Sequence, residues 1–228
     1  MLVALAGFGV WYFMPGGEDA ASAVYFTDEL TGPDSAHFTI PFQAYAMTPK
    51  GLLRSSAVTR RGFGSDRVVV KTVSGDYLSR DFVFEIDVMI PPDAEDLAYV
   101  GFGRGDPNPA YNNEPAGAFQ FRIHSLPWVN RVDASASLPS SDQPAEAGPK
   151  VHAELTPIGQ YVAGSTTTFR IERAGTKVTL SMPGTPGAAH TFDMTLVPTL
   201  FGDGEGFLFF GNSVEGTVFS RARVRPRG

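Results

Sequence analysis

Two carboxylates separated by one residue, Glu85 and Asp87, have the clearest potential for chemistry in this chain. They lie in a segment of alternating side chains, residues 82–90, so both are expected on the same face of a β-strand. Retaining hydrolysis of a glycosidic bond uses two carboxyl groups about 5–5.5 Å apart, one as nucleophile and one as acid/base. Same-face positions on a strand supply that spacing. The alternative interpretation is a solvated or hydrogen-bonded pair on the polar face of a sheet.

A second candidate site is the oxygen-rich loop of residues 105–114. Calcium takes six to eight oxygen ligands, and a tyrosine in such a loop can stack on a sugar ring. The spacing is not that of an EF-hand, and a cluster of Asx and proline turns explains the same composition. No confident metal site and no other cofactor is predicted. The residues of this candidate glycan or calcium loop are Asp106, Asn108, Tyr111, Asn112 and Glu114.

A third feature is a row of alternating arginines, Arg221, Arg223, Arg225 and Arg227, near the end of the chain. Wherever the chain is extended, all four project from one face of a strand. Such a row predicts contact with anionic lipid headgroups or with an acidic partner surface. The alternative is an edge strand whose positive charge protects it against aggregation.

The N-terminal residues 1–15 form an apolar segment without charge, followed by a linker at residues 16–23. As a helix the segment is shorter than a hydrocarbon core, so it is either a membrane anchor or a signal segment. Cleavage near Ala21-Ser22-Ala23 is the second alternative. We expect the remainder, residues 24–228, on the extracytoplasmic (periplasmic) side of a membrane. The anchoring residues are Leu2, Val3, Leu5, Phe8, Val10, Trp11, Tyr12 and Phe13.

The composition of the chain argues against some kinds of partner and excludes some kinds of site. The 228 residues include 18 Lys and Arg against 24 Asp and Glu, a formal charge of −6, which argues against nucleic acid as a partner. The chain has no cysteine, which excludes disulfides and thiolate metal sites. Abundant glycine, proline and phenylalanine favour short strands joined by turns.

The elements that must position these residues are strands. In residues 82–90, Glu85 and Asp87 share one face while Phe84 and Ile86 belong to the other, which indicates a sheet with one buried face. Ala174-Gly175 is expected to be a hairpin turn. We predict an all-β fold, an antiparallel β-sandwich or jelly roll of about a dozen strands. Predicted strands include residues 67–72, 82–90, 97–102, 118–124, 166–173, 177–182, 190–196, 207–211 and 216–224.

The order of these motifs resembles the concanavalin A-like lectin/glucanase superfamily, particularly its laminin-G-like members. The resemblance implies the β-sandwich fold but no single activity, because that fold hosts lectins, glycosidases and structural domains. It rests on Ser79–Glu85 (SRDFVFE), Tyr99–Gly103 (YVGFG), Phe119–Ile123 (FQFRI), Thr168–Leu180, Gly206–Gly211 (GFLFFG) and Thr217–Val224.

Family 16 glycosidases of this superfamily carry a Glu-x-Asp-x-Glu or Glu-x-Asp-x-x-Glu strand. Glu85 and Asp87 match the first two positions, but Met89 and Ile90 stand where the resemblance places the acid/base glutamate. Without that proton donor the leaving group is not protonated. The sequence therefore predicts that the chain is not an enzyme.

From these features we expect a non-catalytic, membrane-tethered accessory or structural subunit of a larger membrane complex, for example a respiratory or photosynthetic one. Its partners would be the membrane, through the N-terminus, and other subunits of the complex. The alternative is a carbohydrate-binding, lectin-like module, with calcium as a conceivable cofactor. A family-16-like glycoside hydrolase is the third hypothesis, and it requires a carboxylate from another strand.

Overall fold

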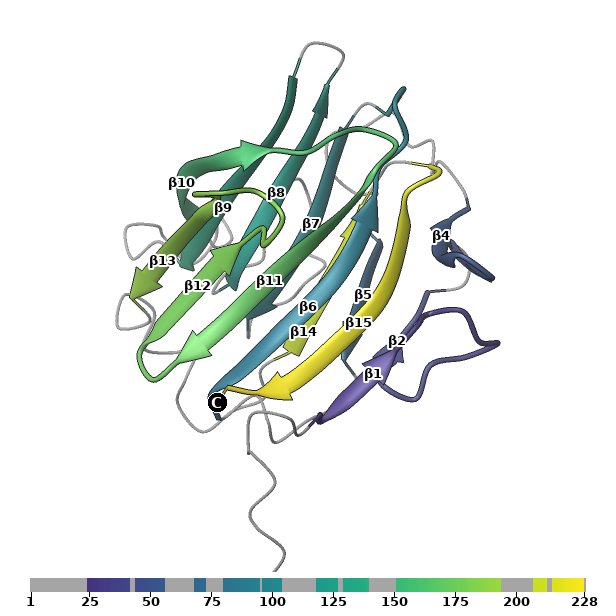
Figure 1. Cartoon of the computed structure of the whole chain (residues 1–228), viewed down its shortest axis with the longest axis horizontal. Helices are drawn as coiled ribbons and strands as arrows, with labels where there is room; N and C mark the ends of the chain where they lie inside the picture. Colours follow the sequence, from purple (N-terminus) through teal and green to yellow (C-terminus); the bar gives the residue numbers. More distant parts are fainter. Residues whose placement is uncertain are drawn as a thin grey trace, which may run out of the picture.

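The chain forms two antiparallel β-sheets packed face to face (Figure 1). The computed structural model describes residues 24–41, 44–55, 68–72, 80–94, 96–103, 118–126, 129–139, 151–193, 207–212 and 215–227. Across these ranges no helix has the length and apolar character needed to cross a membrane. The prediction of an all-β sandwich is confirmed.

The first sheet has eight strands in the described part of the chain, in the order β13-β12-β11-β6-β15-β4-β3. The short strand β1 pairs with the same edge of β15 as β4 does, but further along that strand: β4 pairs with residues 218–219 and β1 with residues 222–224. The bounds of these strands are β1 (Phe26–Asp28), β3 (Tyr45–Thr48), β4 (Gly51–Arg54), β6 (Phe82–Met89), β11 (Thr166–Ala174), β12 (Lys177–Ser181), β13 (Ala189–Asp193) and β15 (Val218–Pro226).

The second sheet has seven strands in those ranges, in the order β10-β9-β8-β7-β14-β5-β2. In each sheet some neighbouring strands are far apart in the sequence, as the sandwich topology requires. Examples are β7 and β14 in this sheet and β6 and β15 in the first one. The bounds are β2 (Phe38–Thr39), β5 (Val68–Thr72), β7 (Asp96–Gly103), β8 (Ala118–Leu126), β9 (Val129–Pro139), β10 (Val151–Gln160) and β14 (Phe207–Asn212).

The core lies between the sheets and is rich in phenylalanine. On β6, Phe82, Phe84, Ile86 and Val88 point into it, which confirms the predicted alternation of this segment. Across the interface Phe82 meets Phe102 edge-on, with ring centroids 5.0 Å apart. Edge-to-face pairs of this kind add to the stabilisation that burial of the rings provides.

The sequence located most strands but missed several. The hairpin turn predicted at Ala174-Gly175 is present one residue further along, at Gly175 and Thr176, and Gly175 has a φ of 56°, a conformation that glycine adopts at little cost. The long strands β9 and β10 were not predicted. Both carry many small or polar residues, and β9 buries Asp133 and Ser135, so neither shows the apolar alternation that identifies a strand.

A glycine on β7 makes room for an aromatic ring on the neighbouring strand. Gly101 lies directly opposite Phe209 of β14, and a Cβ atom at position 101 would lie 2.1 Å from Cζ of that ring. Phe209 is buried with Tyr99 and Ala118 in a small cluster separate from the main core. The ring therefore covers the glycine and leaves no space for a side chain.

We expect Gly101→Ala to lower the free energy of unfolding by about 1–3 kcal/mol, because the methyl group forces Phe209 out of its site. Urea denaturation measures the change. Gly184→Ala is the control: its Cβ would meet no atom within 4 Å, so its effect should stay within about 0.5 kcal/mol. Equal stability of the two variants would contradict tight packing of the Phe209 ring.

Candidate functional site

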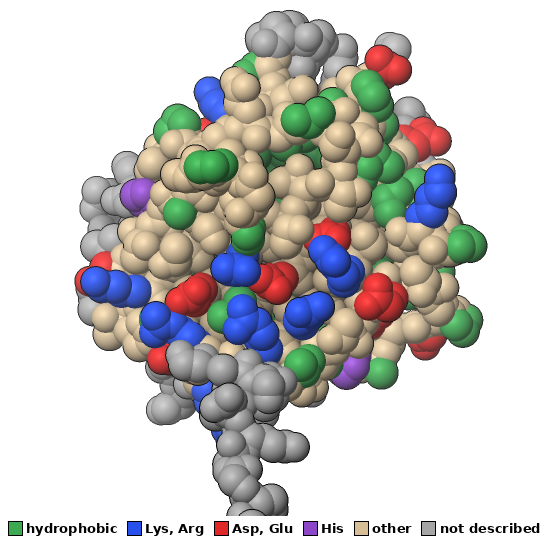
Figure 2. All heavy atoms as spheres, viewed as in Figure 1, with side chains coloured by type: hydrophobic (Ala, Val, Ile, Leu, Met, Phe, Trp, Pro, Cys, Tyr) green, Lys and Arg blue, Asp and Glu red, His purple; other side chains and the backbone are tan. Residues whose placement is uncertain are grey.

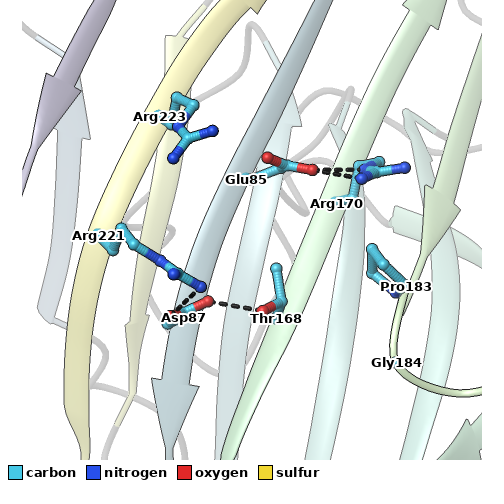
Figure 3. Close-up of a pocket in the computed structure, with 8 residues that line it drawn as sticks. All are labelled: Glu85, Asp87, Thr168, Arg170, Pro183, Gly184, Arg221 and Arg223. Carbon is cyan, nitrogen blue, oxygen red and sulfur yellow. Dashed lines mark hydrogen bonds and ion pairs between the residues drawn. The ribbon is translucent and has the colours of Figure 1, made fainter.

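Glu85 and Asp87 line a pocket on the outer face of the eight-stranded sheet (Figure 3). Its volume is about 220 Å³. Three adjacent strands and the turn between β12 and β13 contribute side chains to it. The lining residues are Glu85 and Asp87 from β6, Thr168 and Arg170 from β11, Arg221 and Arg223 from β15, and Pro183 and Gly184 from the turn.

Glu85 is held by the arginine opposite it on β11. In the ladder Arg170 pairs with Glu85, and its Nε and Nη2 atoms lie 2.7 and 2.5 Å from Oε1 of the glutamate. Both contacts go to the same oxygen. Within the described residues, the Oε2 atom of Glu85 contacts no donor, so it remains able to accept a hydrogen bond from a ligand.

Asp87 is more deeply placed, with 7% of its surface exposed. The hydroxyl of Thr168, directly opposite on β11, donates to Oδ1 at 2.7 Å. Nη2 of Arg221 lies 2.7 Å from Oδ2 on the other side. A buried carboxylate is costly unless it is paired and hydrogen-bonded, and here both oxygens have a donor.

A β-bulge in β15 brings Arg221 to this pocket. Ser220 pairs with Asp87 and Arg223 pairs with Glu85, so β15 has two residues where β6 has one. Ala222 is fully buried, and Arg221 is the extra residue, with a φ of 50°. For a residue other than glycine, this left-handed backbone conformation costs on the order of 1–3 kcal/mol. The bulge keeps Arg221 out of the core and turns it toward Asp87.

Arg223 is the third arginine of the pocket, and in the described part of the chain its guanidinium makes no hydrogen bond or ion pair. It is partly buried and lies opposite Glu85. Acidic and basic side chains are interleaved over this face of the molecule (Figure 2). Since Arg170 and Arg221 each neutralise one carboxylate, the pocket carries one positive charge in excess.

Of the four arginines predicted to form one row, two line the pocket and two lie outside it. Arg221 and Arg223 line the pocket, whereas Nε of Arg227 lies 2.6 Å from Oε1 of Glu172 on β11. Arg225 lies opposite Val83, outside the pocket lining. Two of the four are thus paired within the protein. Sequence reasoning missed Arg170 and Thr168, whose place beside the carboxylates depends on the pairing of strands about 80 residues apart.

The other predicted sites fall outside the described residues. These are the oxygen-rich loop, with Asp106, Asn108, Tyr111, Asn112 and Glu114, and the N-terminal anchor, with Leu2, Val3, Leu5, Phe8, Val10, Trp11, Tyr12 and Phe13. Among the residues that are described, no group of three or more histidine, aspartate or glutamate side chains could hold a metal ion.

A second polar cluster lies on the seven-stranded sheet. Asp133 of β9 is 1% exposed, and its Oδ2 lies 3.0 Å from both Nε2 of His124 and Nη2 of Arg131. Burial lowers the pKa of His124 from its ordinary value of 6.5, and Arg122 acts in the same direction. The Asp133 carboxylate opposes this shift without cancelling it. The folded protein therefore favours the neutral imidazole.

The fold is shared with carbohydrate-active and carbohydrate-binding proteins. No protein-family model and no curated protein matches the sequence. One matching structure comes from work on endo-acting O-glycanases that human gut microbiota express to initiate mucin breakdown (TM-score 0.60, 10% identity, 90% of this chain and 100% of that one). Another is a Bacillus licheniformis β-glucanase (0.54, 12%, 90% and 100%). A third is the CBM2 module of the evolved Dit protein of Lactobacillus casei BL23 phage J-1 (0.52, 12%, 87% and 93%).

These matches confirm the concanavalin A-like fold and correct the functional prediction. The structures that share this fold come from carbohydrate-active and carbohydrate-binding proteins, so a respiratory or photosynthetic accessory subunit is the wrong interpretation, and the carbohydrate-binding alternative agrees better with the shared fold. The prediction that the chain is not an enzyme is corrected as well, because glycanases and glucanases are among the matches. That prediction considered Met89 and Ile90 of a single strand, whereas the pocket is assembled from several.

We expect the stability of the protein to fall as the pH drops through about 6.5, in part through His124. Because the folded state lowers the pKa of this imidazole, the unfolded chain takes up the proton first. Denaturation at pH 7 and pH 5 should show a smaller loss of stability for His124→Gln than for the wild type. An NMR titration that placed the pKa of His124 above 6.5 would contradict this.

Proposed function

We propose that the pocket on the outer face of the eight-stranded sheet binds a carbohydrate. The observation that carries the proposal is the convergence of two carboxylates and three guanidinium groups from β6, β11 and β15 in one pocket. The left-handed backbone at Arg221 supports it, because strain of this kind concentrates at functional sites. The shared fold with glycanases and a carbohydrate-binding module agrees with this ligand class.

The donors and acceptors of the pocket suit sugar hydroxyls, which both donate and accept hydrogen bonds. Oε2 of Glu85 accepts, and the outward N–H groups of Arg170, Arg221 and Arg223 donate. The ion pairs fix Glu85, Arg170 and Arg221 in place before a ligand arrives, which reduces the entropy lost on binding.

The size of the pocket limits how much of a glycan it holds. Its volume of about 220 Å³ is below the roughly 300–1,000 Å³ of sites for drug-sized ligands. We therefore expect it to take one or two sugar units of a longer chain, with the rest lying along the sheet.

The double variant Glu85→Gln/Arg170→Gln tests this function without changing the net charge. Binding to an array of neutral, carboxylated and sulfated oligosaccharides should weaken at least roughly 100-fold, because the variant removes two charged hydrogen-bonding groups that contribute about 1.5–3 kcal/mol each. The array is probed with calcium and again with EDTA, so that it also tests the predicted calcium dependence.

The matched control is Glu172→Gln/Arg227→Gln, which removes the same kind of ion pair from the same sheet outside the pocket. This control should bind as the wild type does. Equal binding by both double variants would place the glycan site elsewhere, and no binding by the wild type would overturn the function.

Cleavage of the bound glycan is a second candidate, favoured by the presence of Glu85 and Asp87 side by side in the pocket. Among the described contacts, one oxygen of Glu85 remains free, so Glu85 is the candidate nucleophile, whereas Asp87 has both oxygens occupied. These are the only carboxylates among the described lining residues. Substrates whose leaving group needs no protonation should therefore react best.

We accordingly expect hydrolysis of nitrophenyl glycosides to exceed that of the corresponding unactivated disaccharides. Release of nitrophenolate is the measurement. Glu85→Gln should abolish it, and Glu172→Gln should leave it unchanged. Turnover that is the same in wild type and Glu85→Gln would overturn this candidate and leave glycan binding untouched.

A further inference from the structure

We propose that the sugar bound in this pocket is anionic and that Arg223 is the residue that recognises its charged group. The inference rests on the proposed function, since it names the class of glycan that the same pocket takes. The shared ligand chemistry is a carboxylate or sulfate group on a sugar ring.

Two of the three arginines in the pocket are already paired with carboxylates, and Arg223 is not. Glu85 is occupied by Arg170 and Asp87 by Arg221. Arg223 stands opposite Glu85 across the strand pair, but Figure 3 draws contacts only from Glu85 to Arg170 and from Asp87 to Arg221 and Thr168. A partly buried guanidinium without a counter-ion gains most from an anionic ligand, because the pair then forms where water is partly excluded.

The local charge of the pocket is opposite in sign to the net charge of the chain. The chain carries a formal charge of −6, yet the described lining of the pocket has three arginines and two carboxylates. Because both carboxylates are paired at 2.7 Å or less with arginine nitrogen atoms, they repel an approaching anion only weakly. The pocket therefore presents the opposite sign to the protein as a whole, which concentrates anionic ligands there.

The pocket offers a ligand polar contacts rather than stacking contacts. Its described lining contains no aromatic side chain on which a sugar ring could stack. Affinity must therefore come from hydrogen bonds, and those between a guanidinium and an anionic oxygen are the strongest of them. A neutral sugar would leave Arg223 with hydroxyl acceptors alone.

The geometry of a guanidinium suits both candidate anions. Its parallel N–H groups match the two oxygens of a carboxylate and also two oxygens of a sulfate. We test both with a panel of uronic acid oligosaccharides, the same oligosaccharides after reduction of the carboxyl groups to neutral sugars, and sulfated oligosaccharides of equal length. Isothermal titration calorimetry at 50 and 500 mM NaCl gives the affinities.

We expect an acidic oligosaccharide to bind at least 10-fold more tightly than its neutral counterpart, with the difference shrinking at high salt. Arg223→Gln should remove this preference, a roughly 10-fold to 100-fold loss for the acidic ligand and little change for the neutral one. Arg225→Gln is the matched control, because it lies two residues further along β15 and outside the pocket lining. It should keep the preference.

The outcomes separate this inference from the function on which it rests. Preference for uronates supports a carboxylate ligand, and preference for the sulfated set supports a sulfate ligand. Equal affinity for acidic and carboxyl-reduced glycans would overturn the anionic inference and leave glycan binding standing. An acidic preference that survives in Arg223→Gln would also overturn it. No binding to any member of the panel would overturn both.

Discussion

The pairing of β6 between β11 and β15 is the constraint on which both the core and the pocket depend. Side chains of β6 alternate, so one face gives Phe84 and Ile86 to the core while the other presents Glu85 and Asp87 to the pocket on the outer face of the sheet. A shift of one residue in its register would bury the carboxylates and expose the phenylalanines, which is strongly unfavourable. Burial of the aromatic face therefore also fixes which residues of β11 and β15 stand beside the carboxylates.

The electrostatics of the pocket follow from that register. Arg170 and Thr168 meet the two carboxylates because they occupy the opposite positions on β11. On β15 the bulge is needed as well. Without the extra residue, Arg221 would lie opposite Ile86 and point into the core, where an unpaired charge is prohibitively costly. The bulge thus reconciles a charged sequence with a buried strand face and supplies Asp87 with its second donor.

The fold alone does not specify a function for this protein, whereas the pocket supports one. Concanavalin A-like sandwiches host many activities, and identities of 10–12% establish the fold alone. The case for a glycan rests instead on the arrangement of acceptors and donors in the pocket. Its charge balance then narrows the glycan to an anionic one, because two of the three arginines are already neutralised.

The local sequence pattern was enough to predict the strands with regular apolar alternation, such as β6, and the turn that contains Gly175. It was also enough to select Glu85 and Asp87, because same-face positions two residues apart depend only on the geometry of one strand. It did not find β9 or β10, which carry many small or polar residues along their length.

The pocket itself was decided by tertiary structure. Arg170 reaches Glu85 from 85 positions away in the chain, and no periodicity in either segment specifies that partner. The alternating arginines correctly indicated a strand near the end of the chain. The bulge that separates Arg221 from the regular ladder, however, arises from the pairing of β15 with β6. Side-chain order along a strand is local, whereas the neighbours that neutralise a charge are chosen by how buried faces pack, and that requires the whole sandwich.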